Sequence, residues 1–319
     1  MHRSFVHASK SIFSSNMKTN KFLIAIVGPT AVGKTEISIK IANQFGAEII
    51  SADSRQFYRE LEIGTAKPDA AELSQAKHYL INSLSIEEEY DVRDFENEAL
   101  EIISKSFENS DSMIMVGGSG LFVNALAYGL DELPEVEDGV REKLNAELTT
   151  LGLLKLQEEL KESDPEYHAS VDLNNPQRVI RALEVIRSTG KPFSSFRTGQ
   201  RVERPFRMIW VGLEMDRAQL YKRIDVRMDQ MIAKGLFQEA QQFYPKRDLN
   251  ALQTVGYKEI FGFLDGDYDK EEAIRLLKRN SRRYAKRQMT WFKKNEEITW
   301  FSPNDLDKIL NHIEKAMQV

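Results

Sequence analysis

The chain has no cysteine among its 319 residues. That absence excludes a disulfide scaffold, a zinc site made of thiolates and a cysteine nucleophile. No apolar run approaches the length of a membrane-spanning helix. A strong net charge is also missing, because 44 Lys and Arg stand against 49 Asp and Glu, so the total charge does not indicate a nucleic-acid partner. We therefore expect a soluble chain with room for two domains, or for one domain that carries an insertion.

Acidic residues are absent from residues 1–16, which are rich in serine and basic residues. This composition is loosely typical of a transit peptide. Because Met17 stands just before the first apolar run, an upstream start codon or a disordered extension is the simpler interpretation. We expect residues 1–16 to form a disordered extension.

What the sequence does contain is a complete phosphate-binding loop of the pattern G-x-x-x-x-G-K-[ST]. Its residues are Gly28, Pro29, Thr30, Ala31, Val32, Gly33, Lys34 and Thr35. The apolar run 22–27 predicts a buried strand before the loop, and the spacing of apolar residues in 36–45 predicts a helix after it. Loop amides and the helix N-terminus make a cradle for phosphate oxygens, where Lys34 adds a charge and Thr35 a hydroxyl for Mg²⁺. The loop predicts a phosphorylated ligand without identifying it.

Strand and helix patterns alternate along the first part of the chain, with β-rich runs at 47–52, 78–84 and 112–116 and a helical pattern at 92–107. This alternation predicts a parallel sheet covered by helices. From residue 131 to 205 the strand signal fades and helical patterns follow one another, before a strand pattern returns at 206–213. The predicted fold class is therefore α/β: a three-layer P-loop core whose parallel sheet is flanked by helices, plus an all-helical insertion domain. The core is expected at residues 17–130 and 206–319, and the insertion at 131–205.

Asp53 stands at the end of the second predicted strand. In open parallel sheets, ligands bind beyond the carboxyl ends of the strands, so Asp53 is expected to face the same cleft as the phosphate loop. There it could contact a metal or a nucleophile, whereas the alternative role is that of a helix N-cap. We favour the functional interpretation.

The strand that ends at Val116 lacks the acid that many ATPases and GTPases place there to hold Mg²⁺. Gly117, Gly118, Ser119 and Gly120 follow instead. This absence argues against an ordinary motor or switch NTPase. The glycines either let the backbone approach a ligand closely or make a tight turn without ligand contact.

Arg223 and Arg227 are four residues apart, so they share one face of a predicted helix. One of them could clamp a diphosphate through paired hydrogen bonds, but exposure to solvent explains the spacing equally well.

A run from residue 275 to 294 contains no acid. Its basic residues recur at helical spacing and form what we call the basic stripe: Arg275, Lys278, Arg279, Arg282, Arg283, Lys286 and Arg287. We predict that the stripe binds a polyanion, the alternative being a solvated basic face. The aromatic residues Tyr284, Trp291 and Phe292 are expected to be core contacts rather than platforms for stacking.

Three classes of function fit these features. A small-molecule kinase would hold a nucleoside triphosphate in the loop and use Asp53 to activate a hydroxyl. A transferase would instead bind a diphosphate leaving group, and the basic stripe favours this class. A non-enzymatic or helicase-like NTPase that binds nucleic acid is weakened by the missing acid and by the short chain.

From about Lys21 to its C-terminal region, the chain resembles the tRNA dimethylallyltransferases, also called tRNA isopentenyltransferases. The resemblance rests on collinear segments at 28–35, 50–54, 63–68, 116–121, 175–178, 181–184, 255–257 and 286–291. Ser119 stands where the family commonly has Thr, and Phe122 where it often has Tyr. A sister family, the adenylate isopentenyltransferases, uses a free nucleotide, and the basic stripe and the helical insertion argue against it.

The resemblance implies transfer of the dimethylallyl group of dimethylallyl diphosphate to the exocyclic amine of the adenosine 3′-adjacent to the anticodon in tRNA, with release of diphosphate. It implies that the loop 28–35 binds the diphosphate with Thr35 on Mg²⁺. The implied catalytic residues are Asp53, which accepts the proton of the amine, and Thr30 and Arg223, which with Lys34 stabilise charge on the leaving oxygen. The adenine must be flipped out of its stack to reach this cleft.

The resemblance also implies a set of tRNA contacts and an insertion that grips the anticodon stem-loop. The implied contacts are Asp53, Ser54, Arg55, Gln56, Ser119, Arg141, Gln177, Arg178, Val179, Ile180, Arg181, Gln253, Thr254, Val255, Gly256, Tyr257, Lys258, Lys286, Arg287, Gln288, Met289, Thr290, Trp291, Phe292 and Lys293. We expect a cytoplasmic monomer without a membrane partner.

Overall fold

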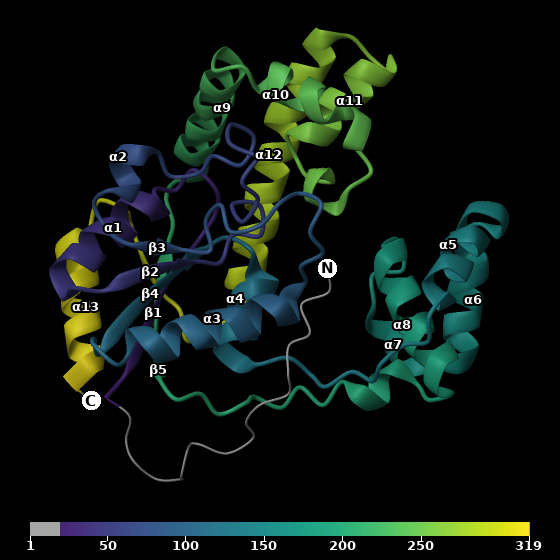
Figure 1. Cartoon of the computed structure of the whole chain (residues 1–319), viewed down its shortest axis with the longest axis horizontal. Coiled ribbons are helices and arrows are strands. Elements are labelled where there is room, and N and C mark those ends of the chain that lie inside the picture. The colour runs from purple at the N-terminus through teal and green to yellow at the C-terminus, as the bar shows by residue number, and fades with distance from the viewer. Residues whose placement is uncertain (1–19, 319) are drawn as a thin grey trace. The chain divides into compact units, whose positions relative to one another are not determined.

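Six strands of the described chain form one sheet in which every neighbouring pair runs parallel. The computed structural model describes residues 20–318, so the extension expected at residues 1–16 lies outside the described residues. The order across the sheet is β3-β2-β4-β1-β5-β6 (Figure 1). The strands are β1 (Phe22–Val27), β2 (Glu48–Ser51), β3 (His78–Tyr79), β4 (Ser112–Gly117), β5 (Arg207–Leu213) and β6 (Thr299–Phe301).

Helices cover both faces of the sheet, which explains why its central strands are apolar without alternation. The covering helices are α1 (Lys34–Phe45), α3 (Val92–Ser106), α4 (Gly120–Tyr128) and α13 (Leu306–Gln318). Leu23 of β1 belongs to a buried cluster with α3 and α4, whereas its neighbour Ile24 belongs to a second cluster with α1 and α13. Figure 1 shows the two helix pairs on opposite sides of the sheet. The core therefore has three layers.

Further helices gather beyond the carboxyl ends of the strands (Figure 1). They are α9 (Arg217–Ala233), α10 (Leu236–Phe243), α11 (Tyr257–Asp265) and α12 (Lys270–Phe292), with the short elements α2 (Ala70–Leu73), η2 (Tyr244–Lys246) and η3 (Asn250–Leu252). Helix α9 packs into both buried clusters, through Ile224 on one side and Met228 on the other. This position brings α9 to the edge of the sheet at which the phosphate loop lies.

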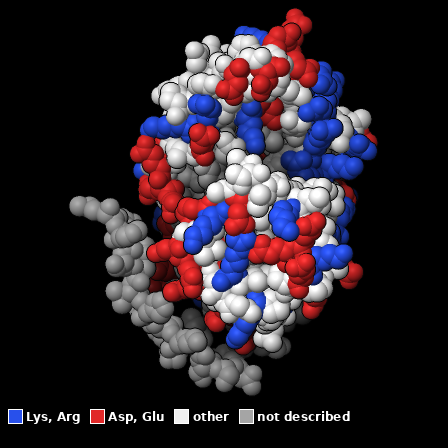
Figure 2. Space-filling model, turned by 90° about the vertical axis from the view of Figure 1, so that its right-hand side faces the viewer, with Lys and Arg blue, Asp and Glu red and all other residues white. Residues whose placement is uncertain are grey.

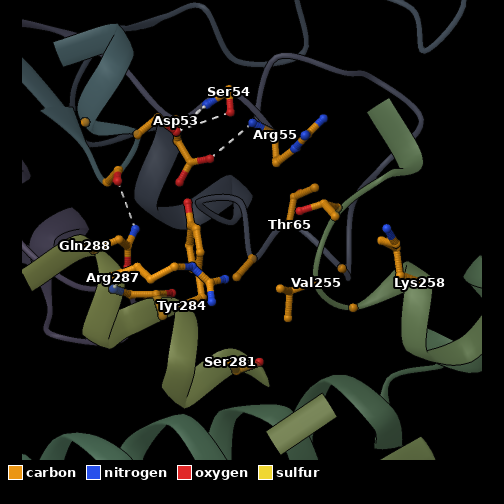
Figure 3. A pocket seen from close by; sticks show the side chains of 18 of the residues that line it. Asp53, Ser54, Arg55, Thr65, Val255, Lys258, Ser281, Tyr284, Arg287 and Gln288 are labelled. Carbon is orange, nitrogen blue, oxygen red and sulfur yellow. Dashed lines mark hydrogen bonds between the residues drawn. The ribbon is translucent and has the colours of Figure 1, made fainter. Parts of the chain in front are cut away.

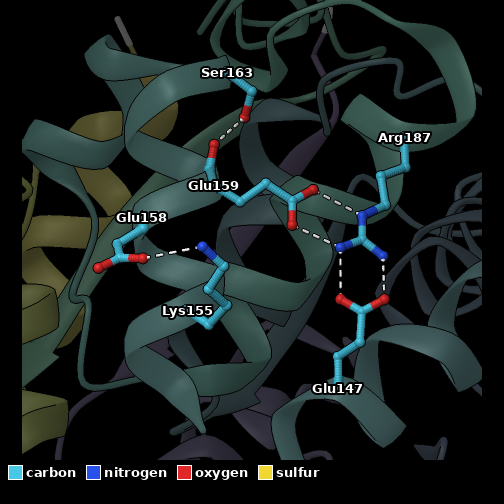
Figure 4. Close-up of polar contacts among 6 residues, drawn as sticks. All are labelled: Glu147, Lys155, Glu158, Glu159, Ser163 and Arg187. Carbon is cyan, nitrogen blue, oxygen red and sulfur yellow. Dashed lines mark hydrogen bonds and ion pairs between the residues drawn. The ribbon is translucent and has the colours of Figure 1, made fainter. Parts of the chain in front are cut away.

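Residues Gly129–Val202 form a separate compact unit, in which the structure contains helices and no strand. Its elements are α5 (Val140–Leu151), α6 (Leu153–Ser163), α7 (Pro165–Ser170), α8 (Pro176–Thr189) and η1 (Phe193–Phe196). Arg187 of α8 makes paired hydrogen bonds with Glu159 of α6, at 2.8 and 2.6 Å, and with Glu147 of α5, at 2.9 and 2.7 Å (Figure 4). One guanidinium group thus joins three helices, and its hydrogen bonds hold the pKa of Glu147 below its usual value.

The predicted fold class is confirmed: a parallel sheet lies between helical layers, and an all-helical unit is inserted between β4 and β5. The third predicted strand is much shorter than expected, because Leu80 and Asn82 have positive φ angles of 58° and 57° and turn the chain after Tyr79. Strand β6 has only three residues and gave no pattern to detect. Among residues 20–318, no helix is both long and apolar enough to cross a membrane.

Candidate active site

The phosphate loop connects β1 to α1, as its sequence predicts. Gly33 precedes α1 with a positive φ of 109°, and within residues 20–318 no side chain caps this helix end. The amino group of Lys34 folds back over the loop and donates hydrogen bonds to the carbonyl oxygens of Gly28 and Pro29, at 3.0 and 2.9 Å. Burial lowers the pKa of Lys34 to about 8, although the charge of Asp53 acts in the opposite direction. The uncapped amides and the lysine together suit an anion.

A cavity of about 1140 Å³, which we call the phosphate-side cavity, opens beside this loop. Loop residues Lys34 and Thr35 form part of its wall, and Arg223 and Arg227 of α9 form another part. The segment around Lys67 adds a further cation, whose pKa burial lowers. Cations therefore stand on several sides of the space in front of the phosphate loop, and the same wall also carries the acids Glu36, Asp53, Glu62, Asp69 and Glu72.

A second cavity of about 540 Å³, which we call the acceptor-side cavity, is also lined by Asp53 (Figure 3). Its wall comes from segments that are far apart in the sequence. They are residues 53–55, 64–66, 118–122 and 253–256 with Lys258, together with Ser281, Tyr284, Arg287, Gln288 and Trp291 of α12. Aromatic and basic side chains share this wall, which is the combination that binds a nucleobase and its phosphates.

The two cavities meet, because six residues belong to both walls. These residues are Thr30, Asp53, Thr65, Ala66, Arg227 and Met231. The meeting point thus carries a carboxylate, a hydroxyl and a guanidinium group. A ligand held by the phosphate loop and a second ligand in the acceptor-side cavity could react there.

Asp53 follows β2 after one intervening residue, and no helix begins at this point. Its carboxylate accepts a hydrogen bond from the amide of Arg55 at 3.1 Å, so it stabilises a turn and is not the helix cap that we considered as an alternative. The hydroxyl of Tyr284 points toward Asp53 (Figure 3). Burial, with the charge of Asp53, raises the pKa of Tyr284 to about 12, so the phenol keeps its proton at neutral pH.

Arg223 and Arg227 have different surroundings in the structure, a difference that their spacing in the sequence does not predict. Arg227 donates a hydrogen bond to the hydroxyl of Thr30, and burial lowers the pKa of its guanidinium group. Arg223 is exposed and lies near Gly33, so both arginines face the phosphate-side cavity. The family resemblance implies a catalytic role for Arg223, whereas the arginine in contact with Thr30 is Arg227.

The glycines after β4 let side chains of α12 approach the backbone closely. Gln288 donates to the carbonyl oxygen of Gly118 at 3.0 Å and accepts from the amide of Thr30 at 2.8 Å. A Cβ atom on Gly118 would lie 2.2 Å from Gln288 Nε2, and one on Gly120 would lie 2.3 Å from the ring of Trp291. Gln288 therefore links the phosphate loop to the turn after β4.

Most of the tRNA contacts implied for the core lie on the acceptor-side wall. They are Asp53, Ser54, Arg55, Ser119, Gln253, Thr254, Val255, Gly256, Lys258, Arg287, Gln288 and Trp291. Ser119 accepts a hydrogen bond from the amide of Ser54 at 3.1 Å, which joins two parts of this wall. Gln56 instead lines the phosphate-side cavity.

The other implied contacts of the core lie outside these walls. Tyr257 and Phe292 are buried, Met289 is half-buried, and Lys286 and Thr290 are exposed. Lys293 is exposed but forms an ion pair with Glu214 at 2.7 Å.

In the helical unit, the implied contacts fall into three groups. Arg141 and Arg181 both bind the buried carboxylate of Glu184, at 2.7 and 3.2 Å. Val179 and Ile180 are fully buried, so their side chains belong to the core of the unit. Gln177 and Arg178 are exposed in the first turn of α8.

The basic stripe divides into a paired and an unpaired part. Lys278 and Arg282 form ion pairs with Asp229 and Asp225 of α9, at 2.6 and 2.5 Å, and Arg275 pairs with Glu272. Within the described residues, no ion pair with an acid involves Arg279, Arg283, Lys286 or Arg287. Figure 2 shows basic and acidic side chains in neighbouring patches on one face of the molecule.

Two aromatic residues of α12 lie in a cavity wall and not where the sequence predicts them. Tyr284 and Trp291 were expected in the core, but both line the acceptor-side cavity, and Trp291 is 37% exposed. Phe292 is buried as expected. The segment 63–68 matched the resembled family without an assigned role, and its residues Thr65 and Ala66 turn out to line both cavities.

The protein offers few ligand atoms for a magnesium ion at this site. Within residues 20–318 there is no group of three or more His, Cys, Asp or Glu side chains arranged for a metal ion. Mg²⁺ does not need such a group when phosphates supply its other ligands. The hydroxyl of Thr35 lines the phosphate-side cavity at the start of α1, which suits this arrangement.

Comparison with known proteins identifies the family. The family model described as "IPP transferase" matches residues 56–295. The tRNA dimethylallyltransferase of Cytophaga hutchinsonii is 52% identical over 94% of this chain and 98% of its own length. That of Christiangramia forsetii is 50% identical over 93% of this chain and 99% of its own length.

Solved structures agree in fold. The tRNA isopentenylpyrophosphate transferase of Bacillus halodurans is 40% identical, with a TM-score of 0.69 over 93% of this chain and 97% of that one. A eukaryotic dimethylallyltransferase studied while acting on tRNA is 27% identical, with a TM-score of 0.76 over 93% of this chain and 77% of that one. The family model spans more than half of the chain, and the relatives match it nearly from end to end, so this chain belongs to the IPP transferase family.

Proposed function

We propose that this protein is a tRNA dimethylallyltransferase, which moves the dimethylallyl group of dimethylallyl diphosphate to the exocyclic amine of the adenosine 3′-adjacent to the anticodon. The observation that carries the proposal is the meeting of the two cavities at Asp53, Thr30 and Arg227. A diphosphate reaches this point from the phosphate loop, and a flipped adenine reaches it from the acceptor side. One chain lines both cavities, so a monomer is sufficient for the reaction.

The reaction forms a bond between the amine nitrogen and the first carbon of the allyl group, while the bond from that carbon to the diphosphate oxygen breaks. The proton of the amine goes to the carboxylate of Asp53. Because an adenine amine is a weak nucleophile, positioning it against the allylic carbon supplies much of the rate. The wall around Asp53, Ser54 and Ser119 orients the base.

The phosphate side stabilises the leaving group. Lys34, Arg227 and the hydroxyl of Thr30 surround the place where negative charge builds on the leaving oxygen, and Arg223 adds charge nearby. Thr35 would hold Mg²⁺ together with diphosphate oxygens, and the ion would neutralise part of the diphosphate charge. The fixed cations of this chain thus act on the leaving group, whereas Asp53 acts on the nucleophile.

The helical unit is proposed to grip the anticodon stem-loop. Arg178 and Gln177 are exposed at the start of α8, where their side chains can donate hydrogen bonds to a phosphate. Arg141 and Arg181 keep part of their guanidinium surface exposed while Glu184 fixes their direction. Arginines held in this way lose little conformational entropy when they bind a phosphate.

The test is a label-transfer experiment with dimethylallyl diphosphate carrying the label in its allyl group. Purified protein is incubated with Mg²⁺ and either bulk tRNA, AMP or a tRNA transcript that has guanosine in place of the target adenosine. We expect label on tRNA and none on AMP or on the guanosine transcript. Label on AMP would contradict the proposal and place the chain with enzymes that use a free nucleotide.

A further inference from the structure

The acceptor-side cavity is walled on one side by two irregular segments that belong to no helix or strand. One consists of residues 61–66, of which 64–66 line this cavity and 62 and 63 line the phosphate-side cavity; the other consists of residues 253–256, which lead into α11. Thr65 and Ala66 of the first segment reach the meeting point of the two cavities. Regular backbone hydrogen bonds do not fix such segments, so some other interaction must hold them in place.

Glu239 of α10 supplies that interaction. Its carboxylate accepts hydrogen bonds from three successive amides, of Glu62 at 3.1 Å, Ile63 at 2.9 Å and Gly64 at 2.8 Å. It also accepts a hydrogen bond from the hydroxyl of Tyr257, at 2.6 Å, directly after the second segment. A single side chain thus binds both segments through four donors.

The contact between the two segments is close-packed. Tyr257 is fully buried, and a Cβ atom on Gly64 would lie 2.5 Å from Cζ of its ring. The amide of Gly256 donates to Glu259 at 2.8 Å, and Glu259 accepts from Asn280 of α12 at 2.7 Å. Helix α12 also carries Tyr284, so the bond from Asn280 ties the second segment to a helix that forms part of the cavity wall.

We propose that Glu239 is a positioning residue for prenyl transfer: its carboxylate sets the spacing of the 61–66 and 253–256 segments, and with it the place of the adenine relative to Asp53. Glu239 lines neither cavity, so it acts through these segments and not on the substrates themselves. The proposal rests on the tRNA dimethylallyltransferase function proposed above. It assigns a role to a carboxylate that the motifs of the sequence did not mark.

Glu239→Gln is the sharpest variant, because it keeps the size of the side chain and replaces one acceptor oxygen by a donor that repels the amides. With tRNA and dimethylallyl diphosphate both saturating, we expect kcat per active site to fall about 10–100-fold. The KM for dimethylallyl diphosphate should change less than kcat, since β1 and α1 hold the phosphate loop and residues 61–66 supply only one part of the phosphate-side wall. In amide hydrogen exchange, residues 61–66 and 253–257 should exchange faster, with β1 and β4 unchanged.

Glu60→Gln is the matched control. Glu60 also accepts two hydrogen bonds, from the hydroxyl of Ser85 at 2.7 Å and from the amide of Ile86 at 3.1 Å. Like Glu239, it lines neither cavity. Its kcat should stay at the wild-type value. Tyr257→Phe, which removes one donor of four, should lower kcat less than Glu239→Gln and serves if that variant does not fold.

Faster exchange in Glu239→Gln with an unchanged kcat would overturn the positioning role, and unchanged exchange would overturn the contact itself. An equal loss of kcat in Glu60→Gln would also overturn the positioning role of Glu239. If wild-type protein transfers no label to tRNA, the proposed function fails, while the exchange measurement still decides whether Glu239 holds the two segments.

Discussion

The phosphate-side and acceptor-side cavities meet at Asp53, but the chain builds them in opposite ways. The phosphate side depends on one continuous strand, loop and helix, residues 22–45, to which α9 adds two arginines. The acceptor side is assembled from segments that lie as far apart as residues 53 and 291. Local sequence therefore determines most of the phosphate-side cavity, whereas long-range packing determines the acceptor-side cavity.

The comparison also concerns charge. On the phosphate side, burial lowers the pKa of both Lys34 and Arg227, so the cations are held in a desolvated cluster. On the acceptor side, Arg287 is exposed and Tyr284 is neutral at physiological pH. The first surface suits a compact, highly charged anion, and the second suits a base and a spread-out phosphate backbone.

The largest effect is expected at the meeting point. Asp53→Ala removes the proposed proton acceptor and leaves the other residues of both cavities in place. Transfer should therefore fall by at least about 100-fold, the usual range for loss of a general base. The affinity for tRNA should stay close to the wild-type value. Single-turnover transfer and tRNA binding on filters measure the two quantities. Full activity in this variant would eliminate Asp53 as the base. Asp53→Asn keeps the size of the side chain but has no carboxylate, so it shows whether the loss comes from the missing proton acceptor or from the missing volume.

The next effect separates the two arginines of α9. Arg227→Gln removes the partner of Thr30 from the leaving-group site and should lower kcat about 100-fold, as loss of a preorganised donor does. Arg223→Gln, four residues away on the same helix face and exposed, should cost clearly less. Steady-state kinetics of the two variants is the measurement. A larger loss of kcat in Arg223→Gln would favour the catalytic role that the family resemblance implies for Arg223.

A third expectation concerns pH on the phosphate side. The pKa of Lys34 is lowered to about 8, so the lysine is charged below that pH and loses its proton as the pH rises through it. Binding of inorganic pyrophosphate in metal-free buffer should therefore weaken above about pH 8, by up to about tenfold per pH unit. Lys34→Met should lack the contribution of Lys34 and keep those of pyrophosphate itself and of Lys67, whose pKa burial also lowers. Titration calorimetry from pH 7 to pH 10 would reveal the difference, and identical pH profiles would contradict it.

The contrast between the two sides explains what the sequence could and could not predict. The sheet, the helical unit, the phosphate loop and the place of Asp53 after β2 follow from patterns of neighbouring residues. Arg223 and Arg227 could not be ranked, because a four-residue spacing gives them one face and only the packing of α9 brings Arg227 to Thr30. The face of α12 that carries Tyr284 depends in the same way on where that helix packs.

The smallest expected effect tests the outer rim of the acceptor side, where the basic stripe divides. Arg283→Gln with Lys286→Gln removes two cations that form no ion pair with an acid within the described residues. The slope of log K for tRNA against log salt should become shallower by about 0.7–0.9 for each phosphate that the protein no longer neutralises. Lys278→Gln with Arg282→Gln removes the same charge, but these residues are paired with Asp229 and Asp225 and should leave the slope nearly unchanged. Equal slopes in the two double variants would mean that net charge alone attracts the tRNA. A shallower slope only in Arg283→Gln with Lys286→Gln would mean that the acids of α9 determine which half of the stripe remains available to RNA.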